Sequence, residues 1–298
     1  MNIGDLAPRE LRRRLAEGEL LLDLGPLLLR IEAVSDSFAS ALPLLYADAR
    51  APEFTEEVAD LSLQLRRAAA GVSVWLIDGR PIGEAKPYPD SLGIAQFEWA
   101  LHWGLAASLA PAIAFHGAVA VGEDGRGVAL IGESGSGKST LVAGLVAGGW
   151  RLCADEYFIV NPAGRVVPLP GPITLKNEAI ELLKQRGGEL VFGPIADHPE
   201  RGRIMHAAAR RKCLPGDSVV VAALIFPTYT TELPFALERL SPSEVFTRLV
   251  RQSHNRQMLG PHGFHRLAAV AQTPASALWF RDLDEALTAV RATLGGLG

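Results

Sequence analysis

Cysteine is scarce in this chain, and no long uninterrupted hydrophobic run is present. The 298 residues include two cysteines, Cys153 and Cys213, which are too few for a disulfide framework and favour a reducing compartment. The most apolar long segment, residues 97–115, contains Glu98 and His102, which argues against a membrane span. We therefore expect a cytoplasmic protein that does not bind membranes.

An excess of charge of one sign is also missing. The formal net charge of −4 gives no electrostatic case for a general nucleic-acid binder, although a local basic patch stays open. The first residues lack a basic stretch followed by an apolar run, so we expect no secretory signal there. With 48% hydrophobic residues the chain can bury one large core or two modest ones, and its length favours two units.

The most informative stretch is GESGSGKST at residues 132–140, which satisfies G-x-x-x-x-G-K-[ST]. An apolar, strand-like segment at 128–131 precedes it, and a helix-like segment at 141–146 follows. A strand, a glycine-rich turn and a helix N-terminus together aim backbone N–H groups at one point, where phosphate binds. Lys138 would neutralise the β and γ phosphates of ATP, and the Ser139 hydroxyl would ligate Mg²⁺. The alternative is a Gly/Ser-rich turn with an incidental lysine.

Lys176 and Glu178 add to this expected site. They are two positions apart, so in an extended segment they share a face and could serve phosphate and metal together. A solvated pair at a helix start is the alternative. The residues expected to hold the nucleotide are Gly132, Ser134, Gly135, Ser136, Gly137, Lys138, Ser139, Thr140 and Lys176.

A carboxylate follows the loop closely. Asp155 comes one helix and one tight return strand after Lys138, so we expect it beside the loop on the neighbouring strand. It could accept a proton from an attacking hydroxyl or act only as a metal-binding acid. Glu156 should point to the other face unless the strand bends, and we expect it to be a weaker metal ligand. The expected metal ligands are Ser139, Asp155, Glu156 and Glu178.

Three other groups have both a structural and a functional interpretation. His116 is either a core histidine or an active-site residue, and the adjacent Gly117 would let a ligand approach. The basic stretch at residues 201–212 is either a solvated face or a source of an arginine for the transferred phosphoryl group. Trp99 and Trp103, which lie in a predicted long helix, are expected to be core residues, and a base-stacking platform is the alternative.

The pattern of apolar residues predicts an α/β fold in two parts. Residues 1–88 form a small mixed α/β unit, and residues 89–298 form the domain that carries the phosphate loop. Predicted helices in the first part cover residues 8–15 and 35–46, and predicted strands cover 20–23, 27–31, 58–66 and 72–77. In the second part a strand at 113–121 returns as a hairpin into the loop strand, and 219–226 is a buried central strand.

The hairpin before the loop, the His116-Gly117 pair and the early Ala154-Asp155-Glu156 make this region resemble HPr kinase/phosphorylase, whose corresponding strand ends Ala-Asp-Asp. The resemblance implies a P-loop kinase domain of the HPr kinase/PEP carboxykinase-like type, with Asp155 as the catalytic base and His116 near the phosphates. A transporter ATPase is disfavoured, because its Leu-Ser-Gly-Gly-Gln signature is missing.

More of the chain resembles the HprK-related kinase A group, which is associated with peptide-modification gene clusters. The shared segments are residues 45–48, 98–103, 170–178, 226–227 and 253–255. Relatives phosphorylate a serine of lasso precursor peptides, so the resemblance implies transfer of the γ-phosphoryl group of ATP, with Mg²⁺, to a serine or threonine hydroxyl of a peptide or small protein. The related bifunctional enzyme is hexameric, which leaves room for a homo-oligomer. A small-molecule kinase and a non-catalytic, nucleotide-gated peptide-binding module are the alternatives.

Overall fold

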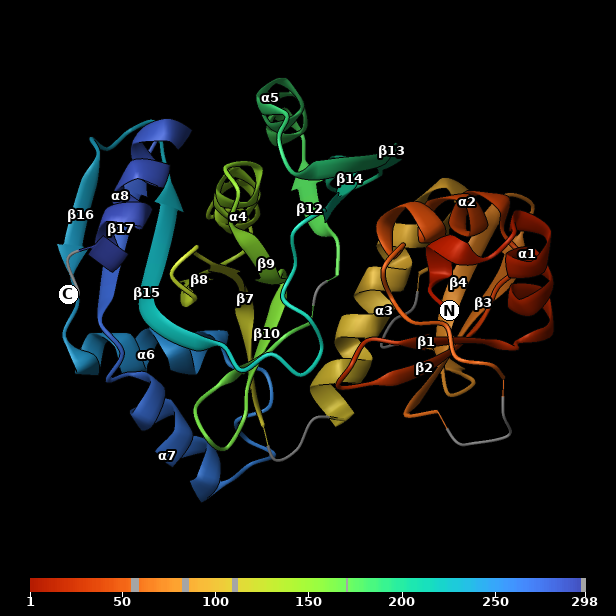
Figure 1. Ribbon diagram of the computed structural model, residues 1–298, viewed down its shortest axis with the longest axis horizontal. Coiled ribbons are helices and arrows are strands. Elements are labelled where there is room, and N and C mark those ends of the chain that lie inside the picture. Colours follow the sequence, from red (N-terminus) through yellow and green to blue (C-terminus); the bar gives the residue numbers. More distant parts are fainter. Residues whose placement is uncertain (55–58, 82–85, 109–111, 170, 296–298) are drawn as a thin grey trace. The chain divides into compact units, whose positions relative to one another are not determined.

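The computed structural model describes residues 1–54, 59–81, 86–108, 112–169 and 171–295 (Figure 1). Within them the fold is mixed α/β, with strands in three sheets. Val58 and Pro170, which belong to a predicted strand and to a shared segment, lie outside the described residues. None of the helices in the described ranges is both long and apolar enough to cross a membrane.

The chain packs into two compact units, and each is interrupted in sequence. The first unit comprises Met1–Ser108, Thr174–Ile180 and Val191–Ala208, and the second comprises Leu109–Ile173, Glu181–Leu190 and Ala209–Gly298. The predicted boundary at residue 88 therefore differs from the boundaries of the compact units, because the long helix after residue 88 belongs to the first unit. Whether the parts 1–88 and 89–298 are functional domains stays a prediction.

The first unit has helices on a sheet whose strand order is β1-β2-β3-β4-β5, with β6 also paired to β4. Its helices are α1 (Pro8–Glu17), α2 (Asp36–Leu45) and α3 (Gly93–Ser108), and its strands are β1 (Leu20–Asp23), β2 (Leu28–Glu32), β3 (Leu61–Ala69), β4 (Val72–Ile77), β5 (Arg80–Pro81) and β6 (Tyr88–Pro89). Phe97 of α3 packs against Phe38 and Trp75, with ring centroids 5.2 and 5.5 Å apart. This shared aromatic core is the reason that α3 belongs to the first unit.

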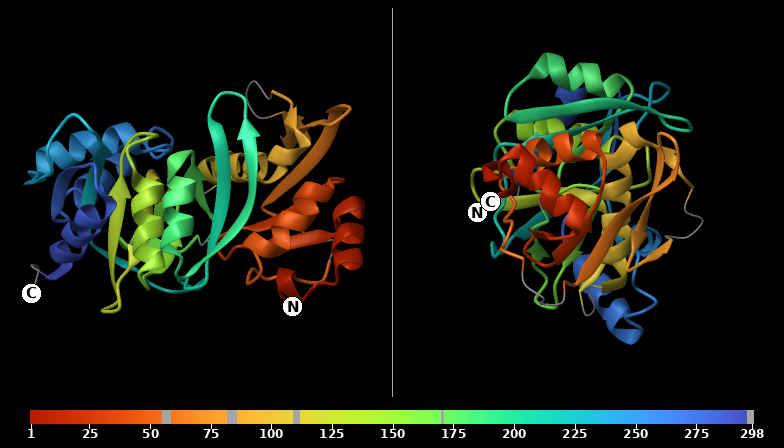
Figure 2. Two further views of the ribbon diagram at one scale, coloured as in Figure 1. Left: turned by 90° about the horizontal axis from the view of Figure 1, so that it is seen from above. Right: turned by 90° about the vertical axis from the view of Figure 1, so that its right-hand side faces the viewer.

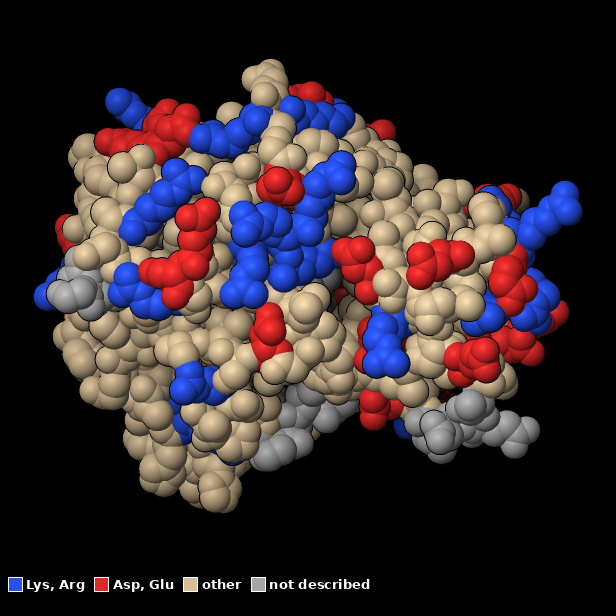
Figure 3. All heavy atoms as spheres, viewed as in Figure 1, with Lys and Arg blue, Asp and Glu red and all other residues tan. Residues whose placement is uncertain are grey.

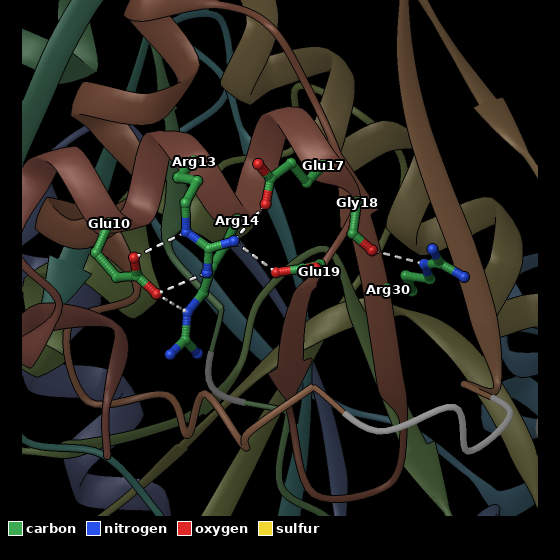
Figure 4. A network of polar contacts seen from close by, with 7 residues as sticks. All are labelled: Glu10, Arg13, Arg14, Glu17, Gly18, Glu19 and Arg30. Atoms are coloured by element: carbon green, nitrogen blue, oxygen red, sulfur yellow. Dashed lines mark hydrogen bonds and ion pairs between the residues drawn. The ribbon is translucent and has the colours of Figure 1, made fainter.

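The end of α1 is fixed by a glycine and by polar contacts (Figure 4). Gly18 adopts a left-handed backbone with φ of 65°, which glycine tolerates best, and its carbonyl accepts a hydrogen bond of 2.7 Å from Arg30 Nε on β2. Arg13 contacts the carboxylates of Glu10, Glu17 and Glu19. Because these ion pairs are exposed, we expect them to contribute little to stability, and the carbonyl contact fixes the turn.

The two tryptophans of α3 lie at the surface, so the prediction that they are core residues is wrong. Trp99 is 42% exposed and Trp103 is 53% exposed, and their rings meet edge to face at 6.3 Å. Their four-residue spacing puts both on one face of the helix, whereas Phe97, Leu101 and Leu105 supply the buried face.

The second unit is built on a larger sheet of strand order β11-β10-β7-β8-β15-β17-β16, with β9 also paired to β7. Its strands are β7 (Ile113–Val121), β8 (Arg126–Ile131), β9 (Arg151–Ala154), β10 (Tyr157–Val160), β11 (Val166–Val167), β15 (Val220–Tyr229), β16 (Ala236–Arg239) and β17 (Ala275–Phe280). Strands β7 and β8 form the expected antiparallel hairpin, and β15 lies between β8 and β17, parallel to both. The predicted hairpin and central strand are therefore confirmed.

Helices cover both faces of this sheet. They are α4 (Lys138–Ala147), α6 (Pro242–Gln252), α7 (Pro261–Val270) and α8 (Leu283–Gly295), whereas the residues of α5 (Glu178–Arg186) are divided between the two units. Leu249 of α6 and Leu267 of α7 are buried in one cluster with Phe115 of β7. Because side chains alternate along a strand, the intervening residues face the other side, where α4 packs on α8 and Gly144 lies against Leu287.

A third, three-stranded sheet has the order β12-β14-β13. Its strands are β12 (Ile173–Lys176), β13 (Leu190–His198) and β14 (Gly202–Ala209), and the long β13 and β14 stand out in Figure 2. Sequence patterns did not predict this sheet.

Cys153 on β9 and Cys213 are both buried as free thiols.

Candidate functional site

The loop between β8 and α4 turns on two glycines with left-handed backbone. Gly135 has φ of 85° and Gly137 has φ of 95°. A Cβ atom on Gly137 would lie 2.7 Å from Phe280 Cζ, whereas a Cβ on Gly135 would meet nothing within 4 Å. Gly137 immediately precedes Lys138, the first residue of α4. The loop therefore presents the N–H groups of the first helical turn, which have no carbonyl partner within the helix, at one point, as an anion site requires.

Two polar side chains of the loop suit an anionic ligand. Lys138 is 6% exposed, and its Nζ donates a hydrogen bond of 2.8 Å to the carbonyl oxygen of Glu133. Ser136 Oγ is buried and has no hydrogen-bond partner among the described residues. A buried hydroxyl without a partner is unfavourable, and a phosphate oxygen would satisfy it. The residues present therefore fit the triphosphate of a nucleotide.

Asp155 lies beside the loop, as expected, although its strand is not the neighbour of β8. Ser139 Oγ donates a hydrogen bond of 3.2 Å to Asp155 Oδ1, and Asp155 is 5% exposed. Strand β7 lies between β8 and β9 and pairs with both. The hairpin thus occupies the position next to β8, so that β9 can join the sheet only beyond β7. A carboxylate and a hydroxyl that could share a magnesium ion are in contact at the start of α4.

Glu156 lies at a break in the strand. Strand β9 pairs with the second half of β7, and strand β10 pairs with its first half. Glu156, between the two strands, has a left-handed backbone with φ of 61°. The strand bends at this residue, which is the exception that the sequence prediction for Glu156 allowed for. Its Oε2 lies 3.3 Å from His116 Nε2. Such a backbone is strained for a residue other than glycine, and strain of this kind is concentrated at functional sites.

Gly117 leaves no space for a ligand. A Cβ atom at this position would lie 2.6 Å from the carbonyl oxygen of Leu130 and 2.8 Å from Phe158 Cε1. The prediction that Gly117 lets a ligand approach is therefore wrong, because the space beside it is filled by β8 and β10. Gly117 instead allows close packing of the strands on either side of His116.

Replacing Gly117 with alanine should destabilise the second unit. We expect Gly117→Ala to lower the free energy of unfolding by about 1–3 kcal/mol, because the new methyl group must displace a backbone carbonyl and a buried ring. Urea denaturation measures this change. Gly295→Ala is the matched control, since a Cβ there meets nothing within 4 Å. Equal stability of the two variants would contradict the packing argument.

Sequence analysis assigned no role to the segment Ser253-His254-Asn255, which the structure places against β7. Asn255 is 2% exposed, and its side chain accepts a hydrogen bond of 3.0 Å from Ala114 N and donates one of 2.9 Å to Ala112 O. The neighbouring His254 ring lies 4.5 Å from the Tyr157 ring and 6.1 Å from the His116 ring. Asn255 thus holds His254 beside the His116–Glu156 pair.

His254 should titrate below the ordinary histidine range. Loss of part of its hydration lowers its pKa, and the nearby His116 lowers it further. In this pH range the folded chain binds fewer protons at His254 than the unfolded chain does. The contribution of neutral His254 to the free energy of unfolding is therefore fully present above about pH 6.5 and is lost as the pH falls. We expect a proton NMR titration to place the His254 midpoint below 6.5, and His116→Gln to raise it. A midpoint that His116→Gln leaves unchanged would contradict the coupling.

Lys176 and Glu178 lie in the segment Thr174–Ile180 of the first compact unit, so their part in the site stays a prediction. The sequence argument assumed an extended segment, and the structure shows that it is not extended between these two residues. Asn177 adopts a left-handed backbone with φ of 51°, Lys176 ends β12, and Glu178 begins α5. The alternative of a solvated pair at a helix start therefore describes the local structure better.

The basic stretch at residues 201–212 was predicted to be either a solvated face or a source of a catalytic arginine. Arg201, Arg203, Arg210 and Arg211 of the basic stretch are exposed. Figure 3 shows lysine and arginine side chains gathered near the middle of the face in view, with aspartate and glutamate side chains around them. Within the described ranges no group of three or more His, Cys, Asp or Glu residues could hold a metal ion. Magnesium in phosphoryl-transfer sites is commonly held by one or two carboxylates together with substrate phosphates.

Chains similar to this one are found among the solved structures. No family model matches the chain, and no curated protein matches it. Among solved structures, the chain is similar to the Hpr(Ser) kinase/phosphatase from Coxiella burnetii, with 14% sequence identity over 62% of this chain and 99% of that chain, at a TM-score of 0.27. Likeness at this level carries no argument about function, which must come from the site itself.

Proposed function

We propose that this chain is an ATP-dependent kinase that transfers the γ-phosphoryl group to a serine or threonine hydroxyl of a peptide or small protein. The observation that carries the proposal is the contact between Ser139 and Asp155 at the start of α4. It joins an anion-binding loop to a buried carboxylate, which is the minimum that phosphoryl transfer to a hydroxyl needs.

Each group has a separate task in this proposal. Lys138 and the N–H groups of the loop bind the phosphates, and Ser139 and Asp155 are the residues that would hold Mg²⁺, whose charge offsets that of the phosphates. The Asp155 carboxylate accepts the proton of the acceptor hydroxyl. The acceptor oxygen then bonds to the γ phosphorus as the bond from phosphorus to the β–γ bridging oxygen breaks, leaving ADP. His116 and Glu156 flank the same turn and would orient the acceptor or the phosphates.

The choice of a peptide acceptor rests on the sequence resemblance to the HprK-related kinase A group. A labelling experiment tests it: the full chain is incubated with γ-labelled ATP, Mg²⁺ and the precursor peptides encoded beside it. We expect label in phosphoserine or phosphothreonine of a peptide. Label in low-molecular-weight alcohols alone would indicate a small-molecule kinase, and ATP binding without transfer would indicate a non-catalytic binding module; either result would reject the proposal.

A further inference from the structure

A pocket of about 750 Å³ adjoins the first half of the phosphate loop, wholly within the second compact unit. Its walls are the loop, the carboxyl end of β15 and one face of α6. The lining residues are Ile131, Gly132, Glu133, Ser134, Gly135, Ser136, Phe226, Pro227, Thr228, Tyr229, Ser243, Glu244, Thr247, Arg248, Arg251 and Gln252. The volume lies in the range of small-molecule sites.

The pocket does not include the contact between Ser139 and Asp155 at the start of α4. Its lining stops at Ser136 and includes neither Ser139 nor Asp155. If phosphates bind at the N-terminus of α4 and the γ-phosphoryl group is transferred beside Asp155, the opposite end of the nucleotide must leave the loop elsewhere. The first half of the loop leads into this pocket, so the nucleoside is the part of the ligand that reaches it.

Tyr229 offers an aromatic surface on the pocket wall. Its backbone N–H donates a hydrogen bond of 3.1 Å to the carbonyl oxygen of Ser136, which ties this residue to the loop. Its side chain is exposed, and its ring packs edge to face with the Phe280 ring, with centroids 5.7 Å apart. A supported ring that stays open to solvent is suited to stacking on a nucleobase, whatever the base.

The α6 wall carries both signs of charge. The Arg248 guanidinium lies over the Phe226 ring, 5.3 Å from its centroid, and Arg251 is one helical turn further on. Glu244 accepts a hydrogen bond from Ser241 N at 2.8 Å, and Glu133 stands on the loop side. An acidic peptide would meet these two carboxylates. A nucleobase edge, which has donors and acceptors side by side, suits such a mixed wall.

We propose that this pocket binds the nucleoside of ATP, with Tyr229 stacking on the base and the polar face of α6 contacting its edge. The inference rests on the proposed function, because it needs a nucleotide in the loop. It adds residues that the phosphate-loop motif does not indicate, and it separates base recognition on α6 and β15 from phosphate recognition on α4.

The test compares two ligands that share phosphates and differ in the nucleoside. Calorimetry on the full chain with Mg²⁺ gives the Kd of ATP and of inorganic tripolyphosphate. We expect Tyr229→Ala to weaken ATP binding roughly tenfold, as loss of one stacked ring does, and to leave tripolyphosphate binding unchanged. Thr247→Trp, at an exposed position of α6, should fill the pocket and give the same selective loss. Trp103→Ala removes an exposed aromatic ring of the first unit and serves as the matched control.

Three results would overturn the inference. Unchanged ATP affinity in both pocket variants would show that the nucleoside lies elsewhere, and equal losses for ATP and tripolyphosphate would show that the variants only disturb the loop. A raised KM for the acceptor peptide at unchanged ATP affinity would make the pocket the acceptor site. If the unmodified chain binds neither ligand, the proposed function fails as well, which separates that failure from the other three.

Discussion

Asp155→Asn should abolish most phosphoryl transfer while the chain still binds ATP. Asparagine has nearly the shape of aspartate and can still contact Ser139, but its amide cannot accept the proton of an attacking hydroxyl. We expect the single-turnover rate of transfer to fall by about 10²- to 10⁴-fold, which is the usual contribution of a general base. ATP affinity should fall much less than the transfer rate, because the loop and Lys138 still bind the phosphates, although the variant loses the negative charge of a residue that would hold Mg²⁺.

Rapid-quench measurement of label transfer, with ATP affinity measured by calorimetry, separates the two effects. Asp124→Asn, in the exposed turn between β7 and β8, is the matched control and should behave as the unmodified chain does. Glu156→Gln tests the neighbouring carboxylate in the same assay, and we expect a smaller loss. Transfer at an undiminished rate in Asp155→Asn would remove Asp155 from the role of base.

Lys138→Ala should act on binding itself. The side chain is buried in the loop, and its ammonium group now donates to a backbone carbonyl that a phosphate would replace. A hydrogen bond to a charged group contributes about 1.5–3 kcal/mol, so ATP affinity should fall by roughly 10- to 100-fold. Calorimetric titration with Mg²⁺ and ATP measures the change.

Lys184→Ala removes an exposed lysine from α5 and controls for the loss of one positive charge. Thermal unfolding of both variants shows whether the loop has kept its structure. An unchanged Kd for ATP in Lys138→Ala would mean that the loop does not bind phosphate through this side chain, and the assignment of residues 132–140 would then have to be abandoned.

The parts of the site that sequence predicted are those whose geometry is local. A strand, a glycine turn and a helix start follow one another within residues 128–146, so backbone preferences alone place them. Asp155 could be predicted for a related reason: one helix and one turn separate it from the loop, which leaves the chain few places to return. The prediction that its strand is the neighbour of the loop strand was nevertheless wrong, since β7 lies between β8 and β9. The order of strands in a sheet depends on which segments pair, and a local sequence pattern does not determine that.

The rest of the site depends on contacts between distant segments. Tyr229 and Arg248 line a pocket together with the loop only because β15 pairs with β8 and α6 packs on β7, and nothing in their local sequence indicates a ligand. Trp99 and Trp103 were misplaced because two large apolar residues four positions apart suit a buried helix face as well as an exposed one. The bend at Glu156 limits what the sequence could predict there, because alternation along a strand holds only where the strand is unbroken.

The packing of α4 on α8 links the nucleotide loop to a segment far along the chain. Gly144 lies against Leu287, and a Cβ atom at this position would be 2.9 Å from Leu287 Cδ1, so a larger residue would require the leucine side chain to shift. Contact this close means that a shift of either helix displaces side chains of the other. We therefore expect an anion that holds the first turn of α4 in place to slow the opening of α8, and amide exchange in residues 283–295 would report on occupancy of a loop that is distant from them in sequence.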